Sequence, residues 1–98
     1  MGGVLYLAFT DGGRFDADDP GPWEELFPLR PELALIESGQ SRSAVYHAVK
    51  DLVPRTAAVL VAPLADVPKF KRMDTGALNW VRARSRGQLA GTADGRRS

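Results

Sequence analysis

Residues 4–10 read VLYLAFT, and this stretch decides the fold. Successive side chains of a β-strand point to opposite faces of a sheet, so the stretch divides into two sets, and both sets are apolar. The sets are Leu5, Leu7, Phe9 and Val4, Tyr6, Ala8. A strand with one face in water would alternate apolar and polar residues. The stretch therefore predicts a strand in a sheet that is covered on both faces.

Two further strands are predicted downstream. Residues 57–64, AAVLVAPL, are again apolar at both sets of alternate positions, which is typical of a central strand, and pairing should fail at Pro63. Residues 33–38 indicate a shorter strand. The first strand should end at Asp11-Gly12-Gly13, because this combination favours a turn.

Helical periodicity is clearest in residues 43–52, where one apolar stripe follows Ser41 or Ser43 as the candidate N-cap. A final helix is expected over residues 76–84, capped by Asp74 or Thr75. Its inward positions would be Ala77, Leu78, Trp80 and Val81. Residues 22–27 predict a helical turn or two, with Pro22 at the first helical position and Pro28 and Pro31 ending it.

These elements predict one α+β domain over residues 1–86, followed by a disordered basic tail, 87–98. We expect three to four strands with the helices on one face, so that the other face of the sheet is left bare. A bare apolar face is unusual on a monomer, which favours a second copy of the chain as its cover. The proline-rich segment 11–32 is the alternative cover.

Composition limits the chemistry. The 98 residues are 44% hydrophobic and 26% charged, as in ordinary globular domains. The chain has no cysteine and one histidine, so disulfides and zinc sites are excluded, and carboxylate-bound magnesium is the remaining metal option. The apolar opening stretch is too short to cross a bilayer. We therefore expect a cytoplasmic protein with no membrane partner.

Charge is unevenly distributed along the chain. Residues 1–38 hold eight acidic and two basic residues, whereas residues 39–98 hold four acidic and eleven basic residues. The second half could present a basic surface to phosphates, or the two halves could attract each other within or between chains. Both interpretations remain open at this point.

A resemblance is carried by several short motifs. They are the apolar first strand ending at Asp11, the strand 33–38, the helix beginning Ser41-x-Ser43-Ala44-Val45-Tyr46, and the strand Val59-Leu60-Val61-Ala62-Pro63-Leu64. This pattern resembles the SinR-like relatives of the small CRISPR-associated spacer-acquisition subunit. Residues 60–64, 68–71, 73, 76–78 and 80–81 also resemble small bacterial proteins of this length.

The resemblance implies a ferredoxin-like α+β sandwich that dimerises through its sheets. In the CRISPR-associated family an aspartate at the end of the first strand is the proposed metal ligand, and Asp11 stands at the matching position, after Thr10. The chain departs from the family because only 22 residues, four of them proline, separate Thr10 from Leu33. We expect a short first helix and allow for the loss of a fourth strand.

Two groups of residues are candidate sites. Asp11 is either a turn residue or a catalytic ligand for magnesium, which would activate water against a phosphodiester. A basic group, Lys69, Phe70, Lys71 and Arg72 with Arg82, Arg84 and Arg86, could bind RNA or DNA, with Phe70 stacking on an unpaired base. Alternatively, Phe70 packs against the core and the basic side chains are simply solvated. We interpret Trp23 and Trp80 as core residues and His47 as a surface residue.

The sequence thus supports three functional hypotheses. The first is a homodimeric accessory or interaction domain without catalytic activity, because no convergent catalytic set is present. The second is a nucleic-acid-binding module that uses the basic second half. The third is a metal-dependent nuclease with Asp11 as ligand.

Overall fold

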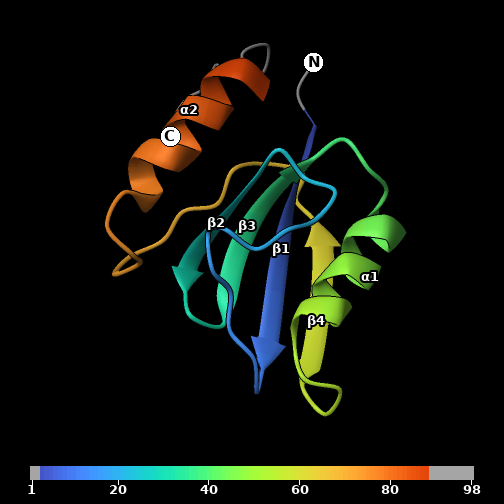
Figure 1. Cartoon of the computed structure of the whole chain (residues 1–98). Helices are drawn as coiled ribbons and strands as arrows, with labels where there is room; N and C mark the ends of the chain where they lie inside the picture. Colours follow the sequence, from blue (N-terminus) through green and yellow to red (C-terminus); the bar gives the residue numbers. More distant parts are fainter. Residues whose placement is uncertain (1–2, 89–98) are drawn as a thin grey trace.

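Six elements make up the computed structural model, which describes the backbone of residues 3–88 and the side chains of residues 3–83. In chain order they are β1 (Val4–Asp11), β2 (Glu25–Arg30), β3 (Leu33–Ser38), α1 (Arg42–Leu52), β4 (Ala58–Pro63) and α2 (Ala77–Gln88). The strands form one antiparallel sheet in the order β2-β3-β1-β4 (Figure 1). The protein is thus a small α+β structure, compatible with a ferredoxin-like sandwich, as predicted.

The predictions for β1, β3 and α1 are confirmed. In β1 the side chains of Tyr6, Ala8 and Thr10 are buried on one face, whereas on the other face Leu5 is buried, Leu7 is half-buried and Phe9 is exposed. The bounds of β3 are as predicted. At α1 the N-cap is Ser41, whose Oγ accepts a hydrogen bond from the Ala44 amide at 3.1 Å. Val45 and Val49 form the buried stripe of this helix. The helical period that the sequence shows in residues 43–52 is therefore the period of burial in α1.

The helix expected over residues 22–27 is not present, and β2 begins at Glu25 instead. Leu26 packs on one face of the sheet, whereas Phe27 and Leu29 pack on the other. Adjacent side chains point in opposite directions in a strand but not in a helix, so burial on both faces requires a strand here. The sheet consequently keeps its fourth strand, and the loss that we allowed for does not occur.

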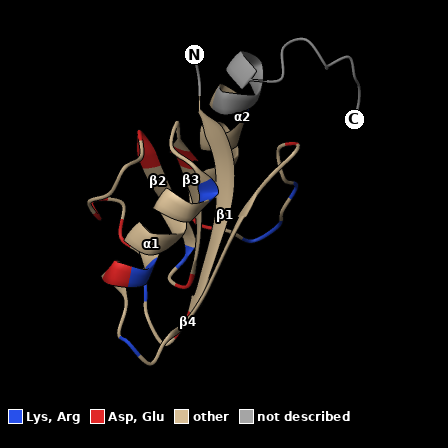
Figure 2. Ribbon diagram, turned by 90° about the vertical axis from the view of Figure 1, so that its right-hand side faces the viewer, with Lys and Arg blue, Asp and Glu red and all other residues tan. Residues whose placement is uncertain are grey.

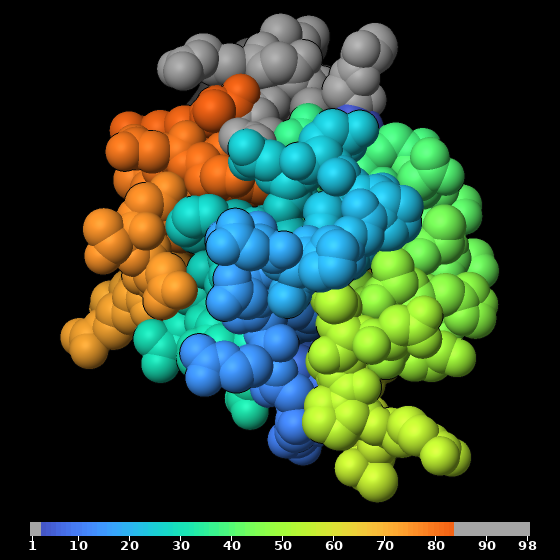
Figure 3. All heavy atoms as spheres, viewed as in Figure 1, coloured from blue at the N-terminus to red at the C-terminus, as the bar shows by residue number. Residues whose placement is uncertain are grey.

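The loop of residues 12–24 lies where a first helix would pack. Phe15 is buried beside Val45 and Val49, and its amide donates to the Pro31 carbonyl at 2.7 Å. Trp23 is half-buried against the same cluster. In Figure 3 the loop, blue to cyan, covers the front of the sheet beside α1. Part of segment 11–32 therefore covers a sheet face, but it is the face on which α1 packs.

The two helices do not share a face, which corrects the expected arrangement. The first-face cluster joins α1 and the loop to the sheet through Tyr6, Ala8, Phe15, Leu26, Ala34, Ile36, Val45 and Val49. The second-face cluster joins α2 to the sheet through Leu5, Leu29, Leu35, Ala77 and Val81. Because Leu5 and Tyr6 are neighbours in β1, these clusters lie on opposite faces. The second face is thus covered, in part, by the chain's own C-terminal helix.

The strand predicted over residues 57–64 as central is an edge strand, β4. It pairs only with β1, and the register places Phe9 opposite Leu60. Val59 and Val61 pack against the first-face cluster. The alternate set, Ala58, Leu60 and Ala62, faces away from that cluster and is exposed or half-buried. The apolar pattern on the second face of β4 is therefore not explained by burial within the described residues.

α2 begins at Ala77 and continues to Gln88, beyond the predicted end at residue 84. Ala77 and Val81 are buried and Trp80 is half-buried, but Leu78 is 53% exposed, contrary to its predicted inward position. Residues 89–98, most of the expected tail, lie outside the described residues. No helix in the described part of the chain is long and apolar enough to span a bilayer.

Candidate functional site

Asp11 occupies the end of β1, opposite Ala58, and is exposed. The next residue, Gly12, has φ of 108°, a left-handed conformation that glycine adopts without a Cβ clash. This geometry fits the interpretation of Asp11-Gly12-Gly13 as a turn. Within residues 3–83 no three His, Asp or Glu side chains gather as a metal site would require. The role of Asp11 as a magnesium ligand stays a prediction.

The basic segment 69–72 lies between β4 and α2, on the side of the sheet opposite α1 (Figure 2). Lys69, Lys71 and Arg72 are exposed, whereas Phe70 is half-buried against the second-face cluster. Packing of its ring against the core favours the interpretation of Phe70 as an anchor of the segment. The segment thus presents three exposed cations, and stacking of Phe70 on an unpaired base stays a prediction.

The other predicted basic residues belong to α2. Arg82 is exposed on this helix. Arg84 and Arg86 lie in the last turns of α2, where side chains are outside the described residues. The predicted group therefore comes from two elements.

An apolar patch lies on the second face, over β1 and β4. Phe9 is 39% exposed and its cross-strand neighbour Leu60 is 52% exposed. Ala58, Leu7 and Ala62 share this face by alternation. We call these five residues the β1–β4 patch. The second-face cluster reaches Leu7 but includes none of the other four, so the cover supplied by α2 and residues 64–76 ends at Leu7.

The β4 edge next to the patch is open. Leu64 donates its amide to the Leu5 carbonyl at 2.8 Å, which makes Leu5 and Leu64 a hydrogen-bonded pair. Because such pairs alternate with non-hydrogen-bonded pairs in antiparallel sheets, the N–H and C=O groups of Val59 and Val61 point away from β1. The ring nitrogen of Pro63 falls on this same outer side.

Apart from Pro63 at its last position, features that usually block an edge strand do not occur in β4. Its sequence, AVLVAP, has no charged residue, and its register with β1 shows no shift. Seen along the sheet in Figure 2, α1 lies to one side of β4 and segment 64–76 to the other. No strand of the described residues pairs with the outer backbone groups of Val59 and Val61.

The sequence of β4 contains a pattern that indicates an exposed second face, although we interpreted this stretch as a central strand. The second-face set of β4 is Ala58, Leu60 and Ala62, and two of these three residues are alanines. Alanines on both sides of one leucine provide few atoms for packing, which is typical of a strand face that makes few contacts within its own chain. The position of Pro63 was also compatible with an edge strand.

Within residues 3–88, fold and surface together define a small α+β domain with a four-stranded antiparallel sheet, two helices and an open, uncharged edge strand, β4. Comparison of the chain with protein-family models, with curated proteins and with solved structures finds no match.

Proposed function

We propose that the protein is a homodimeric interaction domain, without a catalytic role, in which two copies join through their β4 strands. The observation that carries the proposal is the open edge of β4, whose outward backbone groups lie beside the exposed side chain of Leu60. An unprotected edge strand is a template for pairing with another strand. A second copy supplies an edge of the same length and sequence.

The proposed register follows from the backbone. A two-fold axis that passes midway between Leu60 and the partner's Leu60, perpendicular to the sheet, places Val59 opposite the partner's Val61 and Val61 opposite the partner's Val59. Each of these pairs exchanges two hydrogen bonds, because both residues point their N–H and C=O groups outward. Pro63 would face Ala57 beyond these pairs, so its missing N–H removes no bond from them. The result is one continuous eight-stranded sheet.

Side-chain burial favours the same register. Leu60 would meet the partner's Leu60 as a non-hydrogen-bonded pair, in which Cα atoms lie about 4.5 Å apart. Covering a side chain that is 52% exposed contributes about 1 kcal/mol per leucine. Val59 and Val61, which are half-buried in the single chain, would gain a neighbouring strand on their open side.

Stacking of two sheets face to face fits the structure less well. A second sheet packs about 10 Å above the first, in the layer that α2 and residues 64–76 already occupy over β2, β3 and part of β1. Edge pairing needs none of this layer. It also separates the two copies of Asp11 by about 20 Å, four residues along and three strands across. The proposed dimer therefore does not create a shared aspartate site.

Sedimentation velocity of the full chain and two lysine variants tests the proposal. Leu60→Lys puts a charge at the two-fold axis, so we expect the wild type to sediment as a dimer and this variant as a monomer. The matched control is Leu78→Lys, because Leu78 is equally exposed, at 53%, but lies on α2. A wild type that stays monomeric at every concentration, or equal dimerisation of both variants, contradicts the proposal. Circular dichroism verifies that each variant is folded.

The exposed cations of segment 69–72 support nucleic-acid binding as a second candidate function. Single-stranded RNA and DNA oligonucleotides, followed by fluorescence anisotropy, would bind at low salt and release as salt rises, because counterion release supplies the affinity. The Lys69→Glu/Arg72→Glu double variant should abolish this binding. Absence of binding at low salt, or binding unaffected by the double variant, would exclude this function.

A further inference from the structure

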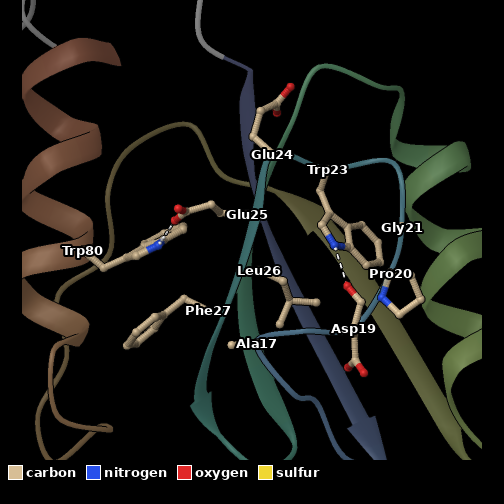
Figure 4. Close-up of a pocket in the computed structure, with 10 residues that line it drawn as sticks. All are labelled: Ala17, Asp19, Pro20, Gly21, Trp23, Glu24, Glu25, Leu26, Phe27 and Trp80. Atoms are coloured by element: carbon tan, nitrogen blue, oxygen red, sulfur yellow. Dashed lines mark hydrogen bonds between the residues drawn. The ribbon is translucent and has the colours of Figure 1, made fainter.

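A pocket of about 370 Å³ opens at the β2 edge of the sheet, on the side of the molecule away from β4. It lies between the loop before β2, the start of β2 and the first turn of α2. Its lining is Ala17, Asp19, Pro20, Gly21, Trp23, Glu24, Glu25, Leu26, Phe27 and Trp80. Segments distant in sequence therefore build it together (Figure 4).

Aromatic rings form its walls, and each indole is held by a hydrogen bond. Trp80 stacks on Phe27 with ring centroids 5.6 Å apart, and its Nε1 donates to Glu25 Oε1 at 2.6 Å. Trp23 lies across from them and donates its Nε1 to the Asp19 carbonyl at 3.2 Å (Figure 4). Rings that are fixed in this way need little further ordering when a ligand binds.

The charge of the described lining is of one sign. Asp19, Glu24 and Glu25 contribute to it, and none of the described lining residues is basic. The Asp19 carboxylate accepts from the Asp16 amide at 2.8 Å and points away from the pocket in Figure 4. The other two acidic lining residues, Glu24 and Glu25, are exposed. Negative charge beside aromatic faces favours a cation with an organic surface.

We propose that this pocket binds a small organic cation, with a guanidinium or alkylammonium group against the Trp23 and Trp80 walls and beside the Glu25 carboxylate. Cations bind over indole faces, and carboxylates strengthen such contacts through charge-assisted hydrogen bonds. The volume is at the lower end of the range for small-molecule sites, which suits a ligand of amino-acid size. The site is independent of the proposed dimer, because it lies on the opposite edge of the sheet.

A hydrated metal ion suits the site less well. Hard cations take several oxygen ligands, and within residues 3–83 no three carboxylates or imidazoles are grouped to supply them. Two indoles and a phenyl ring offer no such ligands. Their faces attract a cation whose hydration is weak, and a guanidinium is such a cation.

Intrinsic fluorescence reports on this site directly, because the chain has two tryptophans and both line the pocket. We expect a saturable fluorescence change on titration with n-butylguanidinium. Its neutral isostere, n-butylurea, should give a response at least about tenfold weaker, since it lacks the charge. Titration with tetramethylammonium separates the two contributions to binding. This cation can contact the aromatic rings but cannot donate a hydrogen bond to the Glu25 carboxylate. Equal affinity for butylguanidinium and butylurea, or no saturable response to either cation, overturns the proposal.

Glu25→Gln removes the charge while it keeps a side-chain oxygen for the Trp80 indole. We expect this variant to bind n-butylguanidinium about three- to tenfold more weakly than the wild type. The matched control is Glu32→Gln, at an exposed glutamate in the turn between β2 and β3. Equal loss of affinity in both variants would show that only overall charge matters, and it would contradict a role for the pocket.

Discussion

Ser38 is a fully buried polar residue at the end of β3 whose hydroxyl joins two loops. Its Oγ donates to the Pro22 carbonyl at 2.5 Å and accepts from the Gln40 amide at 3.0 Å. One bond positions the loop before β2, which carries Trp23, and the other positions the turn before α1. A single side chain thereby fixes the approach of two connections to the first face of the sheet.

Replacement of this hydroxyl should destabilise the fold. Ser38→Ala leaves a buried carbonyl and an amide without their partner, which we expect to lower the free energy of unfolding by about 1–3 kcal/mol. Urea denaturation followed by circular dichroism measures the change. Ser43→Ala, at an exposed position in α1, is the control and should change stability by less than about 0.5 kcal/mol. Equal effects of both substitutions would contradict the role assigned to Ser38.

Residue types in the sequence predicted burial better than they predicted contacts. His47 is exposed, and both tryptophans are half-buried, in keeping with their interpretation as core residues. The approach of Trp80 to Glu25, 55 positions earlier, depends on how α2 docks, and no local pattern encodes that. The pocket was therefore beyond sequence reasoning, although Trp23-Glu24-Glu25 already combined an aromatic residue with acids.

At the scale of elements, the N-cap of α1 offers a direct test. Ser41→Ala removes the oxygen that accepts from the Ala44 amide, and we expect a loss of about 0.5–2 kcal/mol in unfolding free energy. Ser41→Asp should retain most of the stability, because aspartate is an equally good N-cap. A Ser41→Asp variant as unstable as Ser41→Ala would show that this cap does not stabilise the helix.

The docking of α2 leads to a second prediction at this scale. Val81 is buried against the sheet, so Val81→Ala should lower the unfolding free energy by about 1–2 kcal/mol. Leu78 is 53% exposed on the same helix, and Leu78→Ala should change it by less than about 0.5 kcal/mol. Urea midpoints compare the two variants. A larger effect at Leu78 than at Val81 would mean that α2 docks through another side.

Elements whose own residues show a clear hydrophobic pattern were predicted from the sequence. Elements whose conformation depends on packing against other parts of the chain were not. β1 is apolar at both sets of alternate positions, β3 is a short, largely apolar run, and α1 has a helical stripe whose Val45 and Val49 are buried. β2 was mistaken for a helical turn because its few residues between prolines show no clear period. Its strand form depends on two clusters that lie on opposite faces of the sheet, and these form only in the folded chain.

At the scale of the whole molecule, the sheet order β2-β3-β1-β4 is compatible with a ferredoxin-like sandwich in which a loop replaces the first helix. The helix that was expected beside α1 packs on the opposite face instead. The sequence predicted correctly that both faces of β1 need cover. It could not show that α2 supplies cover on one half of the second face and leaves the β1–β4 patch exposed, because both halves are equally apolar in sequence.

Amide hydrogen exchange at Val59 and Val61, read by NMR, tests the proposed β4 pairing most directly. At concentrations where the protein is dimeric, both amides should be protected, and dilution or the Leu60→Lys substitution should remove the protection. The Ala62 amide, which points toward β1, should stay protected throughout. Fast exchange of Val59 and Val61 in a dimeric sample would contradict edge pairing through β4.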